Sequence, residues 1–326
     1  MKNINILILS AGRRVELINR FKRARKKLGI EGKIVAVDIS NTAPAIYFAD
    51  KYYLIPRIDN SEYVNSIIDV CQKENIDLIV PTIDTELLKL SQNRELIETK
   101  TGSKILLSRD EVIQICRNKN NTQAFFEKYG FGVPRQLSCE DIKSEKYSFP
   151  LFIKPEDGSS SVNTFKINNK DELTFFMNYV DKPIIQEFME GTEYSVDVFC
   201  DFNSNPITIV PRKRIATRSG EISKGIIDKD YELIADVKKM LDILKPIGHI
   251  TIQCMKTKKG IEYIEINPRF GGGAPMSIDA GADSCENLYR LLIGEELKYT
   301  ENYNDKFLFV RFDNSIMLNE NMEPMI

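Results

Sequence analysis

The sequence predicts a chain of the α/β and α+β classes, in which a parallel, Rossmann-like α/β domain precedes a larger mixed region. Short apolar strands alternate with helical segments over about the first hundred residues. Near residues 100 to 115 this pattern gives way to hairpins and longer connections, and two glycine-rich segments lie beyond that point. We therefore expect one domain over residues 1–110 and a second over residues 111–326.

The first domain is expected to be a parallel sheet covered by helices. Its strands would end at Ser10, Asp38 and residues 82–84, and open α/β sheets bind ligands along that edge. The segment SAGRRVEL (10–17) is a candidate site for an anionic substrate, but it lacks the GxGxxG spacing of a dinucleotide site. In chain order the elements are a strand at 4–9, a helix after Gly12, a strand at 33–38, a helix at 61–74, a strand at 76–81 and a helix at 86–97.

Composition excludes several classes of protein. The chain has 45 Lys and Arg against 47 Asp and Glu, so a formal net charge of −2 gives no global attraction to nucleic acid. His249 is the single histidine, which rules out a multi-histidine metal site within one chain. No apolar run reaches the ~20 residues of a membrane span, and we expect no secretion signal, because the N-terminal apolar stretch is too short for the apolar part of one. We expect a cytoplasmic protein with no membrane partner.

A hairpin near residue 259 carries a candidate metal site. Gln253 would lie opposite Glu265 in a symmetric hairpin, and Asn267 and Tyr263 would share the face of Glu265. One carboxylate between two amides suits Mg²⁺, although a solvated polar face would show the same residues. Arg269 and the glycines of 271–273 follow directly, where a cation can stabilise a transferring phosphoryl group. His249 would share the face of Gln253, and we favour a structural role for it.

Two further segments suit a nucleotide. Lys154 ends a strand before the small-residue loop EDGSSS (156–161), where backbone N–H groups and a lysine can meet phosphate, although the spacing is not that of a Walker loop. The acidic segment after residue 183 can present backbone groups to adenine at 187–189 and Glu193 to the ribose; an acidic turn is the alternative. A basic stretch follows, in which Arg212 and Arg214 share one strand face.

The ordered series Lys119, FIKPEDGSSS, IIQEFMEGTEYSVDV, Gln253 and EINPRFGGGAP resembles the ATP-grasp superfamily, most closely its carbamoyl phosphate synthase large-subunit branch. The match covers about residues 112 to 295. The resemblance implies a two-subdomain ATP-grasp fold behind a pre-ATP-grasp domain, with a small lid subdomain over about 120–187. It implies that Mg²⁺, or Mn²⁺ in its place, is held by Gln253, Glu265 and Asn267. The residues implied at ATP are Lys119, Lys154, Ser159, Ser160, Ser161, Glu187, Phe188, Met189 and Glu193.

The chain departs from the full-length synthase because it has one grasp unit and no visible glutaminase partner region. It therefore looks like a stand-alone carboxylate–amine ligase that activates a small acid, an amino acid among the candidates, as an acyl phosphate. The partners are then a small carboxylate and an amine, with a homodimer through the grasp domain. Catalytic roles are expected for Arg269, Arg214 and Lys154, and substrate contacts for Arg13, Asp84, Arg212, Arg218 and Gly272.

Three alternatives remain open from the sequence. The first is a nucleotide-binding grasp module without turnover, and the intact pair of lysines and metal triad argue against it. The second is phosphoryl transfer of the carbamoyl phosphate type. The third is a Rossmann oxidoreductase that uses the first domain, which the missing GxGxxG disfavours.

Overall fold

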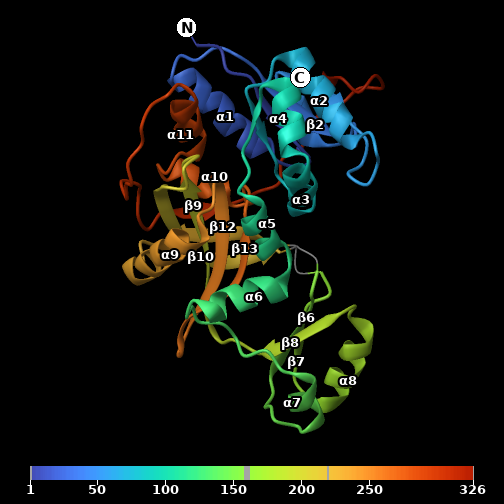
Figure 1. Cartoon of the computed structure of the whole chain (residues 1–326), viewed down its shortest axis with the longest axis vertical. Helices are drawn as coiled ribbons and strands as arrows, with labels where there is room; N and C mark the ends of the chain where they lie inside the picture. Colours follow the sequence, from blue (N-terminus) through green and yellow to red (C-terminus); the bar gives the residue numbers. More distant parts are fainter. Residues whose placement is uncertain (1, 158–161, 219, 326) are drawn as a thin grey trace.

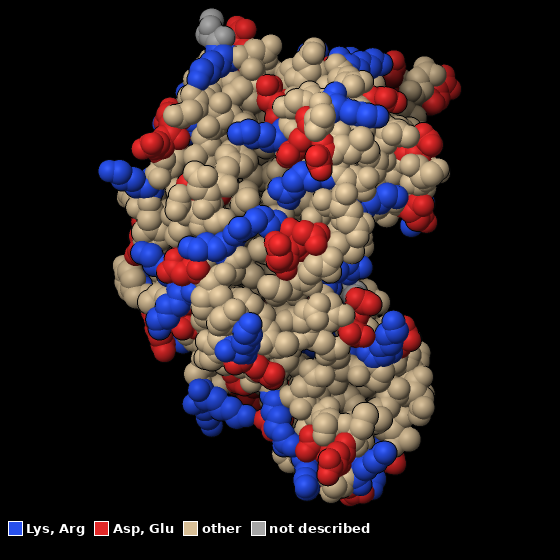
Figure 2. Space-filling view, in the orientation of Figure 1, with Lys and Arg blue, Asp and Glu red and all other residues tan. Residues whose placement is uncertain are grey.

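The computed structural model describes residues 2–157, 162–218 and 220–325 of the chain. Within that part, three sheets of three or more strands and one short hairpin form the framework (Figure 1). No helix there is long and apolar enough to cross a membrane. Basic and acidic side chains are interspersed over the face shown in Figure 2, in keeping with the near-zero net charge.

The N-terminal sheet is parallel throughout and follows the predicted alternation. Its central strand is buried on both faces, because Ile6 and Ile8 pack toward α1 while Leu7 and Leu9 pack toward α2. The sheet order is β3 (Lys51–Leu54), β2 (Ile34–Asp38), β1 (Ile6–Ile8), β4 (Leu78–Val80) and β5 (Lys104–Ile105). The helices of this region are α1 (Val15–Lys27), the 3₁₀ helix η1 (Pro44–Phe48), α2 (Tyr63–Glu74), α3 (Asp84–Gln92) and α4 (Arg94–Thr101).

The single helix expected over residues 86–97 is wrong, since α3 and α4 are separate helices that meet at Asn93. The Asn93 side chain donates a hydrogen bond to the Lys89 carbonyl, so it takes up an acceptor left free where α3 ends. Asn93 also precedes the first residue of α4. The Asn93 side chain thus satisfies the end of α3, and α4 begins at the next residue, Arg94.

The largest sheet has six strands and carries most of the candidate site. Helix α9 packs on one face together with α5 and α6, around buried residues such as Phe126, Val237 and Ile252. In order, the strands are β13 (Gly260–Asn267), β12 (Gly248–Thr257), β9 (Gly191–Cys200), β10 (Pro206–Arg218), β11 (Glu221–Ile227) and β14 (Leu308–Val310). The helices are α5 (Asp110–Arg117), α6 (Lys119–Lys128) and α9 (Tyr231–Leu244).

A smaller sheet forms a unit with its own core, in the lower right of Figure 1. It consists of β7 (Phe165–Ile167), β6 (Leu151–Pro155) and β8 (Pro183–Glu187), with α7 (Cys139–Lys143) and α8 (Lys170–Tyr179). This core begins at Leu137. Helix α6 packs instead on the large sheet, where Phe126 stacks on Tyr263, so the separate core starts later than the lid boundary predicted near residue 120.

The chain returns to the N-terminal sheet after the glycine run, and this return joins the two larger units. Helices α10 (Ala274–Asp279) and α11 (Ser284–Leu292) lie against α1, and the Phe21 ring meets Phe270 and Tyr289 edge to face. An ion pair between Arg20 and Asp279 adds a polar contact. A short hairpin of β15 (Met317–Leu318) and β16 (Pro324–Met325) ends the described chain.

Candidate functional site

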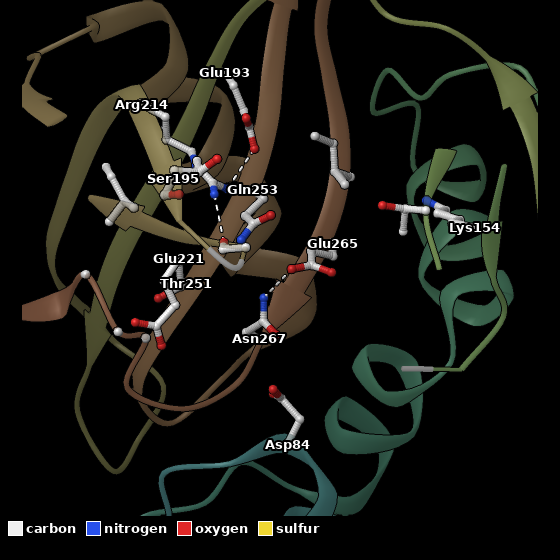
Figure 3. A pocket seen from close by; sticks show the side chains of 18 of the residues that line it. Asp84, Lys154, Glu193, Ser195, Arg214, Glu221, Thr251, Gln253, Glu265 and Asn267 are labelled. Atoms are coloured by element: carbon white, nitrogen blue, oxygen red, sulfur yellow. Dashed lines mark hydrogen bonds and ion pairs between the residues drawn. The ribbon is translucent and has the colours of Figure 1, made fainter. Parts of the chain in front are cut away.

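A cavity of about 530 Å³ lies where the three units meet (Figure 3). Its wall combines the strand-end loop 82–85 of the N-terminal sheet, strand β6 and the residues after β8 in the small unit, and strands β9 to β13 of the large sheet. The residues predicted for the site that line it are Asp84, Lys119, Lys154, Glu187, Phe188, Met189, Glu193, Arg212, Arg214, Gln253, Glu265, Asn267, Arg269 and Gly272.

The predicted strand edge in the N-terminal domain forms one end of this wall. Glu86 is fully buried and accepts hydrogen bonds from the Ser10 hydroxyl and from the backbone N–H groups of Thr82 and Ile83. Asp38 accepts the Gly12 N–H at 2.7 Å. These contacts confirm that the strand ends converge, and they fix the loop that carries Asp84 into the cavity.

The hairpin of β12 and β13, which carries the candidate metal ligands, has the predicted register at its centre. Thr251 pairs with Asn267 and Gln253 with Glu265. The hairpin is not symmetric, however, because the pairing shifts between Gln253 and Cys254. This bulge turns Tyr263 into the hydrophobic core, so the expectation that Tyr263 shares the face of Glu265 is wrong.

A chain of hydrogen bonds links the predicted metal ligands to the N-terminal domain. Asn267 Nδ2 donates to Glu265 Oε1 at 2.8 Å, and Arg269 Nη2 donates to Asn267 Oδ1 at 3.0 Å. The same Arg269 nitrogen lies 2.6 Å from Asp84 Oδ2. Within the described ranges, no cluster of three or more His, Cys, Asp or Glu side chains could hold a metal ion. The predicted ligand set of one carboxylate with two amides, which lines the cavity, stays a prediction.

Two lysines face the cavity from the side of the small subdomain. Lys154 is buried at the end of β6, and Figure 3 shows it across the cavity from Glu265. Burial lowers the pKa of Lys154 to about 8, opposed by Glu265 and reinforced by Lys119. Lys119 begins α6 and donates to the Glu156 carbonyl at 3.3 Å, and burial lowers its pKa as well. Partly desolvated ammonium groups of this kind favour an anionic ligand.

Glu193 and Arg214 form an ion pair on the wall, with Arg214 Nη1 2.7 Å from Glu193 Oε1. Burial raises the pKa of Glu193, and Arg214 opposes that shift. Arg214 Nη2 donates to the Gly220 carbonyl, while its buried Nε has no hydrogen-bond partner in the part of the chain that the structure describes. Glu187 pairs with Lys259 at 2.8 Å.

Arg212 lies in the wall of the cavity, where its guanidinium is committed to a buried ion pair. Its Nε and Nη2 each lie 2.8 Å from a carboxylate oxygen of Asp197, which also accepts hydrogen bonds from Thr251 and Ser277. A Cβ on Gly273 would lie 2.4 Å from Arg212 Nη1, so this guanidinium backs the glycine loop. Contact of Arg212 with a substrate stays a prediction, and the observed contacts are structural.

His249 lies outside the cavity wall, although it is on the predicted strand. Its ring stacks on Phe270 at 4.4 Å, and Nδ1 lies 2.9 Å from the Ser284 hydroxyl. The side chain is buried, with Nε2 3.6 Å from Asp197 Oδ1. These contacts agree with the favoured structural role and not with an approach to the phosphate site.

Two predicted substrate residues do not reach the cavity wall. The Arg13 side chain is 82% exposed and lies 3.8 Å from Asp313. Arg218 is also exposed and pairs with the same Asp313. Both side chains point to the C-terminal segment in the structure described, and their contact with the substrate stays a prediction. Ser159, Ser160 and Ser161 lie outside the described residues.

Sequence reasoning missed Arg14 and Glu221, which line the cavity and form an ion pair at 3.1 Å. Arg311, from the C-terminal segment, lies 2.9 Å from the other Glu221 oxygen. The segment that carries Arg13 and Arg14 is the predicted site for an anionic substrate. In the turn before α1, Arg14 faces the cavity and Arg13 is exposed. No local signal joins Glu221 to residues 14 and 311.

Comparison with known families identifies both larger parts of the chain. Residues 116–273 match the ATP-grasp domain, and residues 6–106 match the PylC-like N-terminal domain. The chain contains an ATP-grasp domain. The predicted ATP-grasp fold behind an α/β domain is thereby confirmed, including the order of its parts.

Curated proteins that are similar to this chain include enzymes that catalyse different reactions. The formate-dependent phosphoribosylglycinamide formyltransferase of Prochlorococcus marinus (strain NATL2A) is 24% identical over 285 residues, which cover 81% of this chain and 70% of the relative. D-alanine–D-alanine ligase A of Bacillus cereus is 24% identical over 284 residues, covering 75% and 91%. Carbamoyl-phosphate synthase of Methanobrevibacter smithii is 22% identical over 188 residues, covering 56% and 49%. These relatives confirm the predicted class, an ATP-dependent ligase.

Solved structures share the fold of this chain. N5-carboxyaminoimidazole synthetase from Staphylococcus aureus, complexed with ADP, has a TM-score of 0.73 at 19% identity and covers 92% of this chain and 80% of its own. The biotin carboxylase domain dimer of Hydrogenobacter thermophilus 2-oxoglutarate carboxylase, in complex with MgADP and bicarbonate, has a TM-score of 0.74 at 19% identity and covers 93% and 73%.

Proposed function

We propose that this chain is an ATP- and Mg²⁺-dependent ligase that activates a small carboxylic acid as an acyl phosphate and joins it to an amine. One observation carries the proposal: a single cavity brings together Lys119 and Lys154, the Gln253–Glu265–Asn267 set, and Arg269. Cations for phosphate, oxygen ligands for a divalent ion, and an arginine for developing charge are the groups that phosphoryl transfer requires.

ATP would bind between the small sheet and the large sheet. In this arrangement Lys119 and Lys154 contact phosphates, residues 187–189 contact adenine, and Glu193 contacts the ribose. Support comes from the burial and the lowered pKa of both lysines. Burial destabilises their charged form, and a bound phosphate would stabilise that form again. The Nε of Arg214, which has no hydrogen-bond partner among the residues described, is a further donor for an anionic group.

Magnesium would be held by Gln253, Glu265 and Asn267. The donors fit, since carboxylate and amide oxygens are ligands of Mg²⁺, which also keeps waters and phosphate oxygens; Mn²⁺ accepts the same donors. In the structure the Asn267 oxygen faces Arg269 and its nitrogen faces Glu265. Rotation of the amide would bring the oxygen beside Glu265, where an ion would bind, and would release the contact with Arg269. When bound, the ion neutralises charge on the phosphoryl oxygens.

The chemistry has two steps. A carboxylate oxygen of the acid attacks the γ-phosphorus, the bond from that phosphorus to the departing ADP oxygen breaks, and an acyl phosphate forms. The amine nitrogen then attacks the acyl carbon and phosphate leaves, while the nitrogen gives up a proton. Arg269, which pairs with Asp84, would stabilise developing charge beside the candidate metal ligands.

The test is release of ADP and phosphate over a panel of acid–amine pairs. An active pair is expected to require Mg²⁺, and Glu265→Gln should lower its turnover by about 10²-fold or more. Glu145→Gln, an exposed carboxylate paired with Lys170, is the matched control and should behave like the wild type. Full turnover in Glu265→Gln would show that the metal assignment is wrong.

Other results of the same panel separate the alternatives. ATP binding with no ADP release over the whole panel would indicate a binding module. Phosphate release with bicarbonate and no acid would indicate chemistry of the carbamoyl phosphate type. We also propose a homodimer, which sedimentation of the whole chain tests.

A further inference from the structure

A cluster of charged residues lies at the end of the cavity away from the lysines. Figure 3 shows Glu221 and Lys154 on opposite sides of Gln253 and Glu265. Glu221 begins β11 and lines the cavity together with Arg14, which precedes α1. If ATP occupies the lysine side, this end is left for the second substrate.

Glu221 is an ionised acceptor with capacity to spare. Burial by itself would raise the pKa of its carboxyl, but Arg14 and Arg311 outweigh that effect and lower it. Each oxygen accepts one hydrogen bond, Oε1 from Arg14 and Oε2 from Arg311. A carboxylate offers about four lone-pair positions, and 43% of this side chain remains exposed. A further donor can therefore bind without breaking either ion pair.

Arg14 is the complementary group beside it. Its Nη1 donates to Glu221 at 3.1 Å, and a guanidinium has five N–H donors in all. Burial lowers the pKa of Arg14, and the nearby cations Arg269 and Arg311 lower it further while Glu221 opposes them. With three arginines near one another, a carboxylate brought in by a ligand would relieve the repulsion.

The glycine loop limits what can stand next to Glu221. A Cβ on Gly272 would lie 2.4 to 2.6 Å from the carboxylate atoms of Glu221, which is closer than any real contact. Gly271, Gly272 and Gly273 all line the cavity. The loop backbone thus packs directly against Glu221, and a side chain at position 272 would displace that carboxylate.

We propose that the acid activated by this protein is a free α-amino acid, whose ammonium group binds Glu221 and whose α-carboxylate binds Arg14 on the side of Arg269. The proposal rests on the proposed ligase function and names its substrate class. A free amino acid carries an ammonium group beside a carboxylate. The Glu221–Arg14 pair offers a carboxylate beside a guanidinium, so each charge of the ligand would meet its opposite. An acid without the amino group makes no charge-assisted hydrogen bond to Glu221, so the site binds it less tightly.

The experiment compares matched acids, each amino acid with the same acid lacking its α-amino group, such as alanine with propionate and glutamate with glutarate. For an active amino acid, kcat/KM of ADP release should exceed that of its desamino partner by at least about 10-fold. Glu221→Gln should raise KM for the amino acid by about 10-fold and leave KM for ATP within about 2-fold. Asp313→Asn, an exposed carboxylate near this cluster, is the matched control.

Binding keeps the proposal testable apart from turnover. Calorimetric titration of the amino acids into whole protein with MgADP should show binding that Glu221→Gln weakens, and thermal unfolding checks that the variant is folded. Equal use of amino and desamino acids, or an equal effect of Glu221→Gln on both, would overturn the substrate class and leave the ligase standing. If no acid drives ADP release, the ligase proposal fails; absence of amino-acid binding would then overturn this one as well.

Discussion

The two ends of the cavity differ in how the chain builds them. At the ATP end, the candidate metal ligands come from one hairpin, β12 and β13, whose register places Gln253 opposite Glu265. At the acid end, Arg14, Glu221 and Arg311 come from three segments separated by 90 residues or more. The first end can be found by reading short motifs, whereas the second exists only after the chain has folded.

This difference matches the division of labour in the proposed reaction. Binding ATP and a divalent ion requires the same donors whatever the second substrate is, so the motifs can stay local and general. Choosing the acid requires side chains that surround a particular molecule, and these come from loops and chain ends. Variants at each end should therefore fail in different ways.

The largest effect is expected where both ends share a support. Asp197 accepts hydrogen bonds from Arg212, behind the glycine loop, and from Thr251, two residues before Gln253. Burial alone would raise the pKa of Asp197, but Arg212 and His249 outweigh it and hold that pKa below its ordinary range. Asp197→Asn leaves the Arg212 charge buried without compensation, so it should lower the free energy of unfolding by about 3–5 kcal/mol.

Urea denaturation measures this change. Asp242→Asn is the matched control, because that side chain is 68% exposed and lies 3.7 Å from Lys245. A loss below about 1 kcal/mol for Asp197→Asn would mean that the two ends of the cavity do not depend on a common buried ion pair.

The next effect separates the ATP end from the acid end. Lys154→Met should lower kcat/KM for ATP by about 10²-fold and change KM for the acid much less, since a buried cation at the phosphates is lost. Lys170→Met, an exposed lysine of the same subdomain, is the control. An equal loss for ATP and acid would erase the proposed distinction between the ends.

The pH profile sharpens the same prediction. The pKa of Lys154 is about 8, and the protonated lysine is the form that attracts phosphate. For the free enzyme, kcat/KM for ATP should therefore be constant below pH 8 and fall about 10-fold per pH unit above it. Lys154→Arg keeps its charge in that range and should not show the fall.

The sequence was sufficient for whatever depends on local order. Alternating apolar segments predicted the parallel sheet, and the ordered motifs predicted the ATP-grasp domain that residues 116–273 match. Two predictions are wrong because a single residue alters the local pattern. A bulge in the hairpin buries Tyr263, and Asn93 divides the helix expected over 86–97. Glu221 was missed for another reason, because its partners are distant in the chain and no spacing rule connects them.

The smallest and most selective effect concerns two adjacent arginines. Arg14 has 20% of its side chain exposed and lines the cavity, whereas Arg13 is 82% exposed and faces Asp313. Arg14→Ala should raise KM for the acid by about 10-fold, because one charge-assisted contact is lost, and Arg13→Ala should change it by less than about 2-fold. Steady-state KM values for acid and ATP measure both variants. If Arg13→Ala had the larger effect, Arg13 and not Arg14 would contact the acid, as the sequence alone predicted.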